Sequence, residues 1–72
     1  MDNDTMYKYA VAVVRTAIEE GRQRGWHNVR PWILRRHTND EVNDRVVKYF
    51  QLTGYDVYVE PHIEDIVFNV TW

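Results

Sequence analysis

Arginine and tryptophan gather in one stretch of nineteen residues, 21–39, that contains no aspartate or glutamate. A guanidinium group can form paired hydrogen bonds with a phosphate or a carboxylate, and an indole offers a flat surface for stacking a base or a cation. The same two residue types are the usual anchors of protein–protein interfaces. We term residues 21–39 the Arg/Trp segment. Its candidate binding residues are Arg22, Arg24, Trp26, Arg30, Trp32, Arg35 and Arg36.

The Arg/Trp segment has three interpretations. In the first, the two indoles cover a small hydrophobic core and the arginines lie over them with their charged ends in water. In the second, a partner protein accepts the indoles in a pocket and pairs its acidic groups with the arginines. In the third, the segment binds the phosphates of single-stranded nucleic acid or of a small nucleotide. Of the two binding interpretations, we rank the protein partner above phosphate.

Nucleophilic catalysis has few candidate residues in this chain. It contains neither serine nor cysteine, so a Ser-His-Asp or Cys-His site is excluded. Its three glycines match neither a phosphate-binding loop nor a dinucleotide-binding motif. We therefore expect a non-enzymatic protein that needs no cofactor.

Metal-ligating residue types are also sparse. His27 and His37 lie ten positions apart and His62 stands alone, so no pair has the spacing of a zinc site on a helix. One polar cluster remains, in a predicted turn: Glu60, His62, Glu64 and Asp65. Its carboxylates could hold a hard cation, but a solvated turn is the simpler interpretation, and we expect no metal site.

Length and composition limit the fold. A chain of 72 residues with 44% hydrophobic residues has room for one domain, residues 1–72, and for one thin core. Without cysteine, dense aromatic packing or oligomerisation is left to stabilise that core, and we expect a homo-oligomer. The chain has no stretch of about 18 apolar residues and no signal-peptide pattern, so we expect a cytoplasmic protein without a membrane partner.

Charge is unevenly distributed along the chain. Residues 1–20 carry a net charge of −2, residues 21–39 carry +5 and residues 40–72 carry −5. A chain with this acidic balance is a poor general binder of nucleic acid, although a local basic stripe could still bind one. The basic segment of one copy could equally face the acidic half of another copy in a head-to-tail contact.

Two helices are predicted. After the possible N-caps at residues 2–5, apolar residues recur at helical spacing from Met6 to Ile18, and Gly21 or Gly25 can end the helix. The broad apolar sector of this helix indicates a core face or, alternatively, a dimer face. A capping box with Thr38 as the N-cap and Glu41 reaching back predicts a second helix, which Gly54 closes.

Three strands are predicted around these helices. Pro31 favours a short extended edge strand over Trp32–Leu34. Residues 55–60 and 66–72 alternate in polarity about a turn near residues 61–65, which is typical of a β-hairpin with one buried face. On its outer face, Tyr58 and Val67 are expected to lie opposite each other in an exposed cross-strand pair.

These elements predict an α+β fold. Two helices are expected to pack on one face of a small two- or three-stranded antiparallel sheet, in the order α-(β)-α-β-β.

The order of elements also resembles a group of viral proteins. The second helix runs into Gly54-Tyr55-x-Val57, and the chain finishes on Trp72. In this it resembles small, uncharacterised proteins of tailed bacteriophages that end in a helix, Gly-Tyr-x-Val, a turn, a strand and a tryptophan. The resemblance covers most of the chain as an ordering of elements. It implies a virion component or an intracellular factor that acts on host machinery in the host cytoplasm, and it assigns no catalytic or ligand residue.

The preferred function is therefore a small non-enzymatic interaction module. We expect it to be phage-encoded and to bind a host or phage protein through the Arg/Trp segment. One alternative is a binder of phosphate, nucleic acid or nucleotide, and another is a structural virion component whose surface packs copies together.

Overall fold

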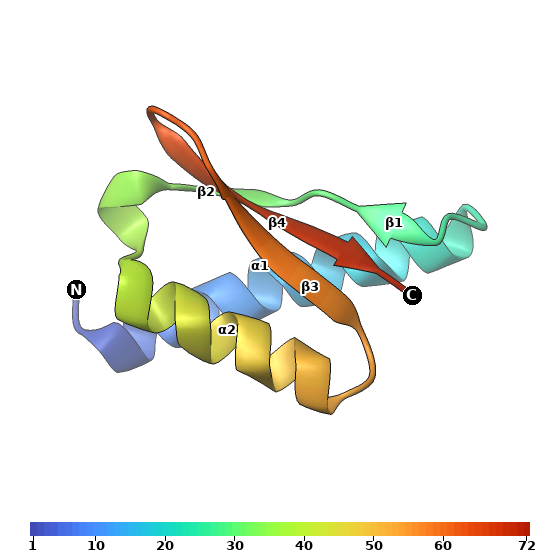
Figure 1. Cartoon of the computed structure of the whole chain (residues 1–72), viewed down its shortest axis with the longest axis horizontal. Helices are drawn as coiled ribbons and strands as arrows, with labels where there is room; N and C mark the ends of the chain where they lie inside the picture. The colour runs from blue at the N-terminus through green and yellow to red at the C-terminus, as the bar shows by residue number, and fades with distance from the viewer.

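The computed structural model describes all 72 residues, and its two helices begin at the same end of the molecule (Figure 1). Helix α1 spans Asn3–Gln23, and the Asp2 side chain caps it by accepting the Thr5 backbone N–H at 2.7 Å. Gly25 follows α1 with φ +75°, the left-handed geometry that ends many helices. Helix α2 spans Asp40–Leu52, and Gly54 follows it with φ +100°. Both predicted helices are confirmed.

The predicted cap of α2 is wrong by one residue. Asn39, not Thr38, accepts the Val42 backbone N–H, at 2.9 Å. The Thr38 hydroxyl is buried and donates instead to the Asn43 side chain at 2.6 Å. Because the Thr38 hydroxyl bonds to Asn43 in the interior, it does not cap the helix, and the Asn39 side chain caps it instead.

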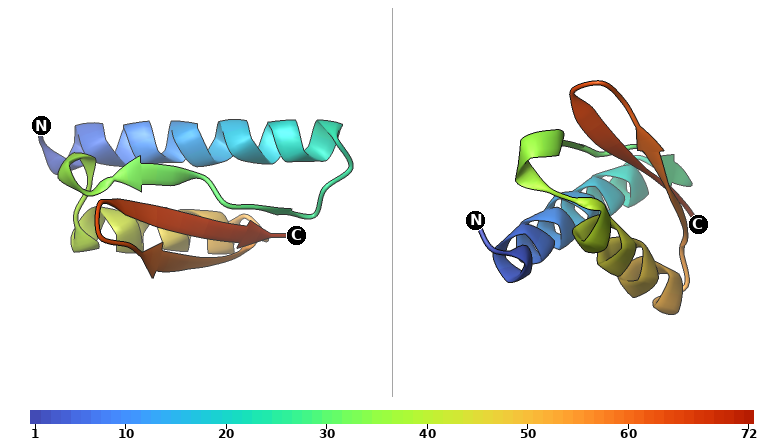
Figure 2. Two further views of the ribbon diagram at one scale, coloured as in Figure 1. Left: turned by 90° about the horizontal axis from the view of Figure 1, so that it is seen from above. Right: turned by 60° about the vertical axis from the view of Figure 1, so that its left-hand side comes forward.

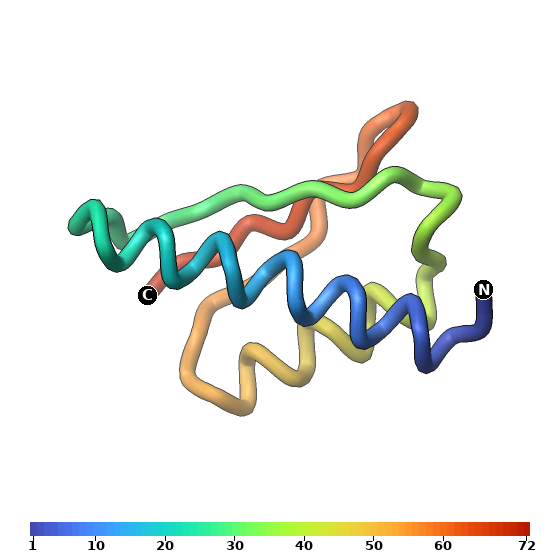
Figure 3. The backbone as a smooth tube through the Cα atoms, turned by 180° about the vertical axis from the view of Figure 1, so that it is seen from behind, coloured from blue at the N-terminus to red at the C-terminus, as the bar shows by residue number.

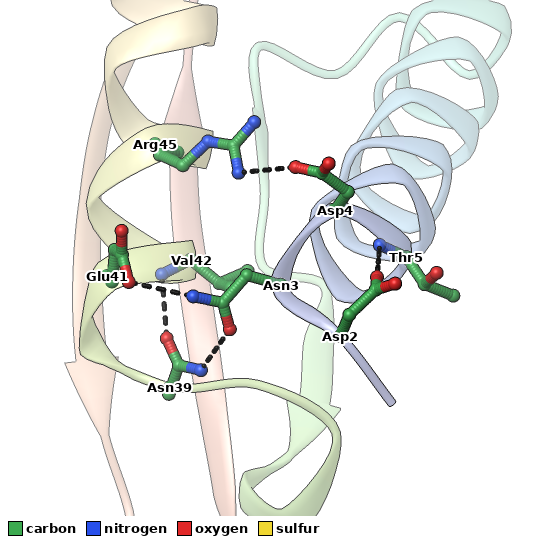
Figure 4. Close-up of polar contacts among 8 residues, drawn as sticks. All are labelled: Asp2, Asn3, Asp4, Thr5, Asn39, Glu41, Val42 and Arg45. Atoms are coloured by element: carbon green, nitrogen blue, oxygen red, sulfur yellow. Dashed lines mark hydrogen bonds and ion pairs between the residues drawn. The ribbon is translucent and has the colours of Figure 1, made fainter.

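Polar side chains join the starts of the two helices (Figure 4). The Asn39 amide donates to Asn3 at 2.8 Å, and the Asn3 amide donates to Glu41 at 2.7 Å. Arg45 of α2 pairs with Asp4 of α1 at 3.2 Å. Glu41 therefore contacts α1 rather than reaching back to its own helix cap. These bonds use the acidic groups at both helix starts to fix how α1 and α2 meet.

The sheet is antiparallel and has β4, Asp65–Thr71, at its centre. Strand β3, Asp56–Pro61, pairs with one edge of β4. Strands β1, Asn28–Val29, and β2, Trp32–Leu34, pair with the other edge, and a short 3-10 helix, η1, follows at Arg35–His37. The edge strand predicted at 32–34 is confirmed, but the sheet has four strands where two or three were predicted.

Strands β1 and β2 are two halves of one edge strand. Asn28 lies opposite Thr71 and Leu34 opposite Asp65, in one unbroken register. Between the halves, the Pro31 carbonyl accepts the Phe68 N–H at 2.8 Å. Because proline has no N–H to donate in return, the ladder is interrupted at that point.

Both helices pack on the same face of the sheet, as the reverse view in Figure 3 shows. The α+β fold with helices on one face is confirmed. The core consists of Met6, Ala10, Val14, Ile18, Val29, Ile33, Val42, Val46, Phe50, Val57, Ile66, Phe68 and Val70. The main apolar stripe of α1 therefore faces this core. Neither helix is long and apolar enough to cross a membrane.

Gly21 lies inside α1 rather than at its end, and there it meets the sheet layer. A Cβ atom at this position would lie 2.7 Å from the Val29 side chain and 3.0 Å from the Trp72 ring. The absence of a side chain thus lets the last turns of α1 approach β1 and the end of the chain.

Candidate functional site

One face of the sheet carries no helix. Side chains alternate along a strand, so the residues whose neighbours enter the core point the other way. The left view of Figure 2 looks onto this side, with no helix in front of the strands. We term it the open sheet face and define it by Arg30, Trp32, Tyr58, Glu60, Val67 and Asn69.

Two aromatic side chains stand out on the open sheet face. The Trp32 side chain is 58% exposed and Tyr58 is 59% exposed. Val67 lies between them on β4, directly opposite Trp32 on one side and Glu60 on the other. The face therefore carries one exposed aromatic side chain on each of the two strands that flank β4.

The predicted direct pair of Tyr58 and Val67 is wrong. The register of the hairpin places Tyr58 opposite Asn69, so Tyr58 and Val67 are diagonal neighbours. The pairing continues to Pro61 opposite Ile66, which leaves only residues 62–64 in the turn. This turn is shorter than predicted, and its length decides which outward residues meet.

A polar network crosses the open sheet face between the two aromatic residues. The Arg30 guanidinium contacts both carboxylate oxygens of Glu60, with Nη2–Oε1 at 2.8 Å and Nε–Oε2 at 3.2 Å. The Asn69 amide donates to the same Oε2 at 2.8 Å. The Asn69 bond first and the Arg30 bonds second hold the pKa of the Glu60 carboxyl below its ordinary value of 4.5. The charge of Arg30 is therefore matched within the chain.

Two further carboxylates point to this side of the sheet. Asp56 and Asp65 share the outward parity of their strands with Tyr58 and Val67. Neither aspartate forms an ion pair in the structure, whose two ion pairs join Arg30 to Glu60 and Arg45 to Asp4. Exposed aromatic side chains with unpaired carboxylates near them suit a partner with the opposite charge.

The seven predicted binding residues do not form one patch. Arg24 lies over Trp26, with its guanidinium carbon 5.1 Å from the ring centroid, in the connection from α1 to β1. Arg35 and Arg36 lie in η1, beyond the far end of the edge strand. Figure 1 shows the α1–β1 connection and η1 at opposite ends of the molecule.

The other three predicted residues divide between two places. Arg30 and Trp32 lie on the open sheet face, midway between the ends of the segment. Arg22 lies in the helix layer, with its guanidinium carbon 5.6 Å from the Tyr55 ring centroid and 5.7 Å from that of Trp72. Of the seven predicted residues, Arg30 and Trp32 alone lie on the open sheet face.

The interpretation in which the two indoles cover the core is also wrong. Trp26 is 49% exposed, and Trp32 points away from the core because its neighbour Ile33 points into it. The aromatic cover of the core comes instead from partly buried Tyr7, Tyr49, Tyr55 and Trp72.

The alternation in the sequence placed Glu60 and Asn69 on the outer face of the hairpin, but it did not predict their contacts with Arg30 and with each other. Those contacts depend on the pairing of β4 with both edge strands. The polar turn cluster of Glu60, His62, Glu64 and Asp65 does not gather into a group able to hold a metal ion.

The chain was compared with protein-family models, curated proteins and solved structures, and none of them matches it. The resemblance to tailed-phage proteins therefore stays a prediction.

Proposed function

We propose that this protein is a small protein-interaction module that binds a partner protein through the open sheet face. The observation that supports this most strongly is the pair of exposed aromatic residues, Trp32 and Tyr58, on a face that no helix covers. Large aromatic side chains in an interface centre supply much of its binding energy. The core is complete without them, so their exposure serves no packing role inside the chain.

The charges near this face define the partner's chemistry. Asp56 and Asp65 have no cationic partner, whereas Arg30 is already paired with Glu60. We therefore infer a partner surface with an apolar pocket and basic residues at its rim. This replaces the earlier expectation that arginines of this chain pair with acids of the partner.

Phosphate binding has less support from the geometry. A phosphate approaching the open sheet face would meet the unpaired carboxylates of Asp56 and Asp65. The arginine on this face, Arg30, is already paired with Glu60. Two of the arginines without a carboxylate partner, Arg24 and Arg35, flank an edge strand whose seven residues span about 20 Å at roughly 3.3 Å per residue. They therefore do not converge on one phosphate.

The resemblance to tailed-phage proteins suggests the biological setting. In that setting the partner is a host or phage protein. If the protein is instead a virion component, the same face packs one copy against another, and the solution mass will depend on Trp32 and Tyr58.

Affinity capture with matched variants tests this function. The wild-type chain, a Trp32→Ala/Tyr58→Ala double variant and a Leu52→Ala control are immobilised and exposed to a nuclease-treated lysate of the source cells. Leu52 is 88% exposed on α2 and lies outside the open sheet face. The expected result is one polypeptide retained by wild type and control and lost from the double variant. Equal retention by all three proteins contradicts the proposal.

A further inference from the structure

A second site lies in the helix layer, in a groove between α1 and α2. The groove encloses about 320 Å³, at the lower end of the range for ligand pockets. Ile18 and Phe50 supply its buried apolar floor. Arg15 and Arg22 of α1 face Tyr49 and Tyr55 across it, and none of these residues belongs to the open sheet face.

A tyrosine positions each arginine of the groove. Arg15 donates a hydrogen bond to the Tyr49 hydroxyl, and Arg22 donates one to the Tyr55 hydroxyl at 2.7 Å. The guanidinium carbons also lie 5.8 Å and 5.6 Å from the centroids of the same two rings. Such contacts restrict the two long side chains and leave other N–H donors on each guanidinium for a ligand.

Neither groove arginine has a carboxylate partner. Arg45 makes a useful comparison, because it also stacks on a tyrosine, Tyr7, at 4.2 Å, but it pairs with Asp4. Arg15 and Arg22 form no ion pair, although Glu19 lies between them on the groove wall. The groove thus holds two positioned cations and one acid above an apolar floor.

The spacing of the arginines limits what can occupy the groove. They are seven residues apart on α1, or about 10.5 Å along the axis at roughly 1.5 Å per residue. The two guanidinium groups are held at different tyrosines, so a ligand with two anionic groups suits them better than a single phosphate. A peptide in the polyproline II conformation covers about the same length in one turn of three residues, at roughly 3.1 Å each, and its side chains three positions apart point to the same side.

We propose that the α1–α2 groove binds an acidic peptide segment of a partner protein in the polyproline II conformation. Two carboxylates three positions apart would pair with Arg15 and Arg22, and an apolar side chain between them would lie towards Ile18 and Phe50. Charge complementarity and the arginine spacing select this occupant. This site is independent of the proposed function of the open sheet face.

A peptide titration of the full chain, followed by NMR of its backbone amides, tests the proposal. The probe is acetyl-Asp-Ala-Leu-Asp-amide, and the neutral control is acetyl-Asn-Ala-Leu-Asn-amide. Shifts are expected in residues 15–22 and 49–55 with the acidic peptide only. Arg15→Gln and Arg22→Gln should each weaken binding about threefold to tenfold, whereas Lys8→Gln, on an exposed part of α1, should leave it unchanged.

Four outcomes overturn the proposal. They are no shift up to about 5 mM peptide, equal binding of the neutral peptide, equal shifts from inorganic phosphate alone, and shifts that lie on the open sheet face. Because Arg22 also packs on Trp72, Tyr49→Phe provides a milder variant that keeps the ring and removes the hydroxyl holding Arg15. It should weaken peptide binding while its melting temperature stays close to wild type. The Trp32→Ala/Tyr58→Ala variant should bind the peptide normally, so this site and the open sheet face can fail separately.

Discussion

The open sheet face and the α1–α2 groove use the same residue types in opposite ways. On the open sheet face, Arg30 is matched by Glu60, and the aromatic side chains of Trp32 and Tyr58 are free. In the groove, the tyrosines are engaged by arginines, and it is the guanidinium groups that lack a carboxylate. The comparison teaches that arginine and aromatic content do not define a binding surface. A binding surface is defined by which group, the guanidinium or the aromatic ring, has no partner inside the chain.

The open sheet face and the α1–α2 groove are both built on the same hydrophobic core. A substitution at the centre of that core should therefore have the largest effect on stability. Phe68 of β4 is fully buried, on the face of the sheet that both helices cover. Phe68→Ala should lower the free energy of unfolding by about 3–5 kcal/mol, through lost burial and the cavity left behind. Urea unfolding measures this value. Tyr58→Ala, on the opposite face of the neighbouring strand, should change it by less than about 1 kcal/mol, and a similar loss in both would contradict the assigned faces.

The free aromatic residues should dominate partner binding. Trp32→Ala and Tyr58→Ala should each cost about 2 kcal/mol of binding free energy, or about thirtyfold in affinity, because each removes a large contact from the interface centre. Once the captured partner is in hand, calorimetry measures both values. If Trp26→Ala, in the connection after α1, costs as much, the partner is not centred on the open sheet face.

The matched arginine should matter least for the same partner. Arg30→Gln should change the partner affinity by less than about threefold, because the Arg30 charge is already paired and half exposed. The identical calorimetric titration checks this. A loss of affinity as large as that of Trp32→Ala would show that Arg30 leaves Glu60 to bind the partner. Arg30 would then not differ from the groove arginines.

The smallest effect concerns the titration of Glu60. Its pKa is lowered by Asn69 and then Arg30, so the stability this group contributes is present at neutral pH and is lost as the pH falls through its lowered pKa. Asn69→Ala should raise that pKa towards 4.5 and shift the loss to higher pH. Carbon-13 NMR of the Glu60 carboxyl measures the change. The pKa of Asp2, lowered chiefly by the Thr5 backbone N–H, should not move.

Local signals were enough to predict most of the elements. Helical spacing and Gly54 placed the two helices, and alternation placed the hairpin. The cap of α2 failed because Thr38 is bonded to Asn43, a contact formed only when α2 is folded. Strand β1 was missed because its two residues precede Pro31 and gain their partners only from β4, about forty residues later in the chain.

The candidate site was harder to predict than the fold. The sequence places Arg22 to Arg36 in one segment, but an extended strand separates neighbours by its length and turns successive side chains to opposite faces. The segment was therefore divided among the end of α1, the open sheet face and η1. The residues that share the open sheet face with Trp32 and Arg30, such as Tyr58 and Asn69, come from the hairpin. Only the register of three strands brings them together.

Site-specific photo-crosslinking tests the central claim most directly. Tyr58 and, separately, Leu52 are replaced by p-benzoylphenylalanine, and each full-length protein is irradiated in a nuclease-treated lysate of the source cells. Both positions are exposed, but only position 58 lies on the open sheet face. We predict a crosslinked polypeptide at position 58 that is absent at position 52 and disappears when Trp32→Ala is added. Equal crosslinking at both positions, or no polypeptide at position 58, would contradict the account.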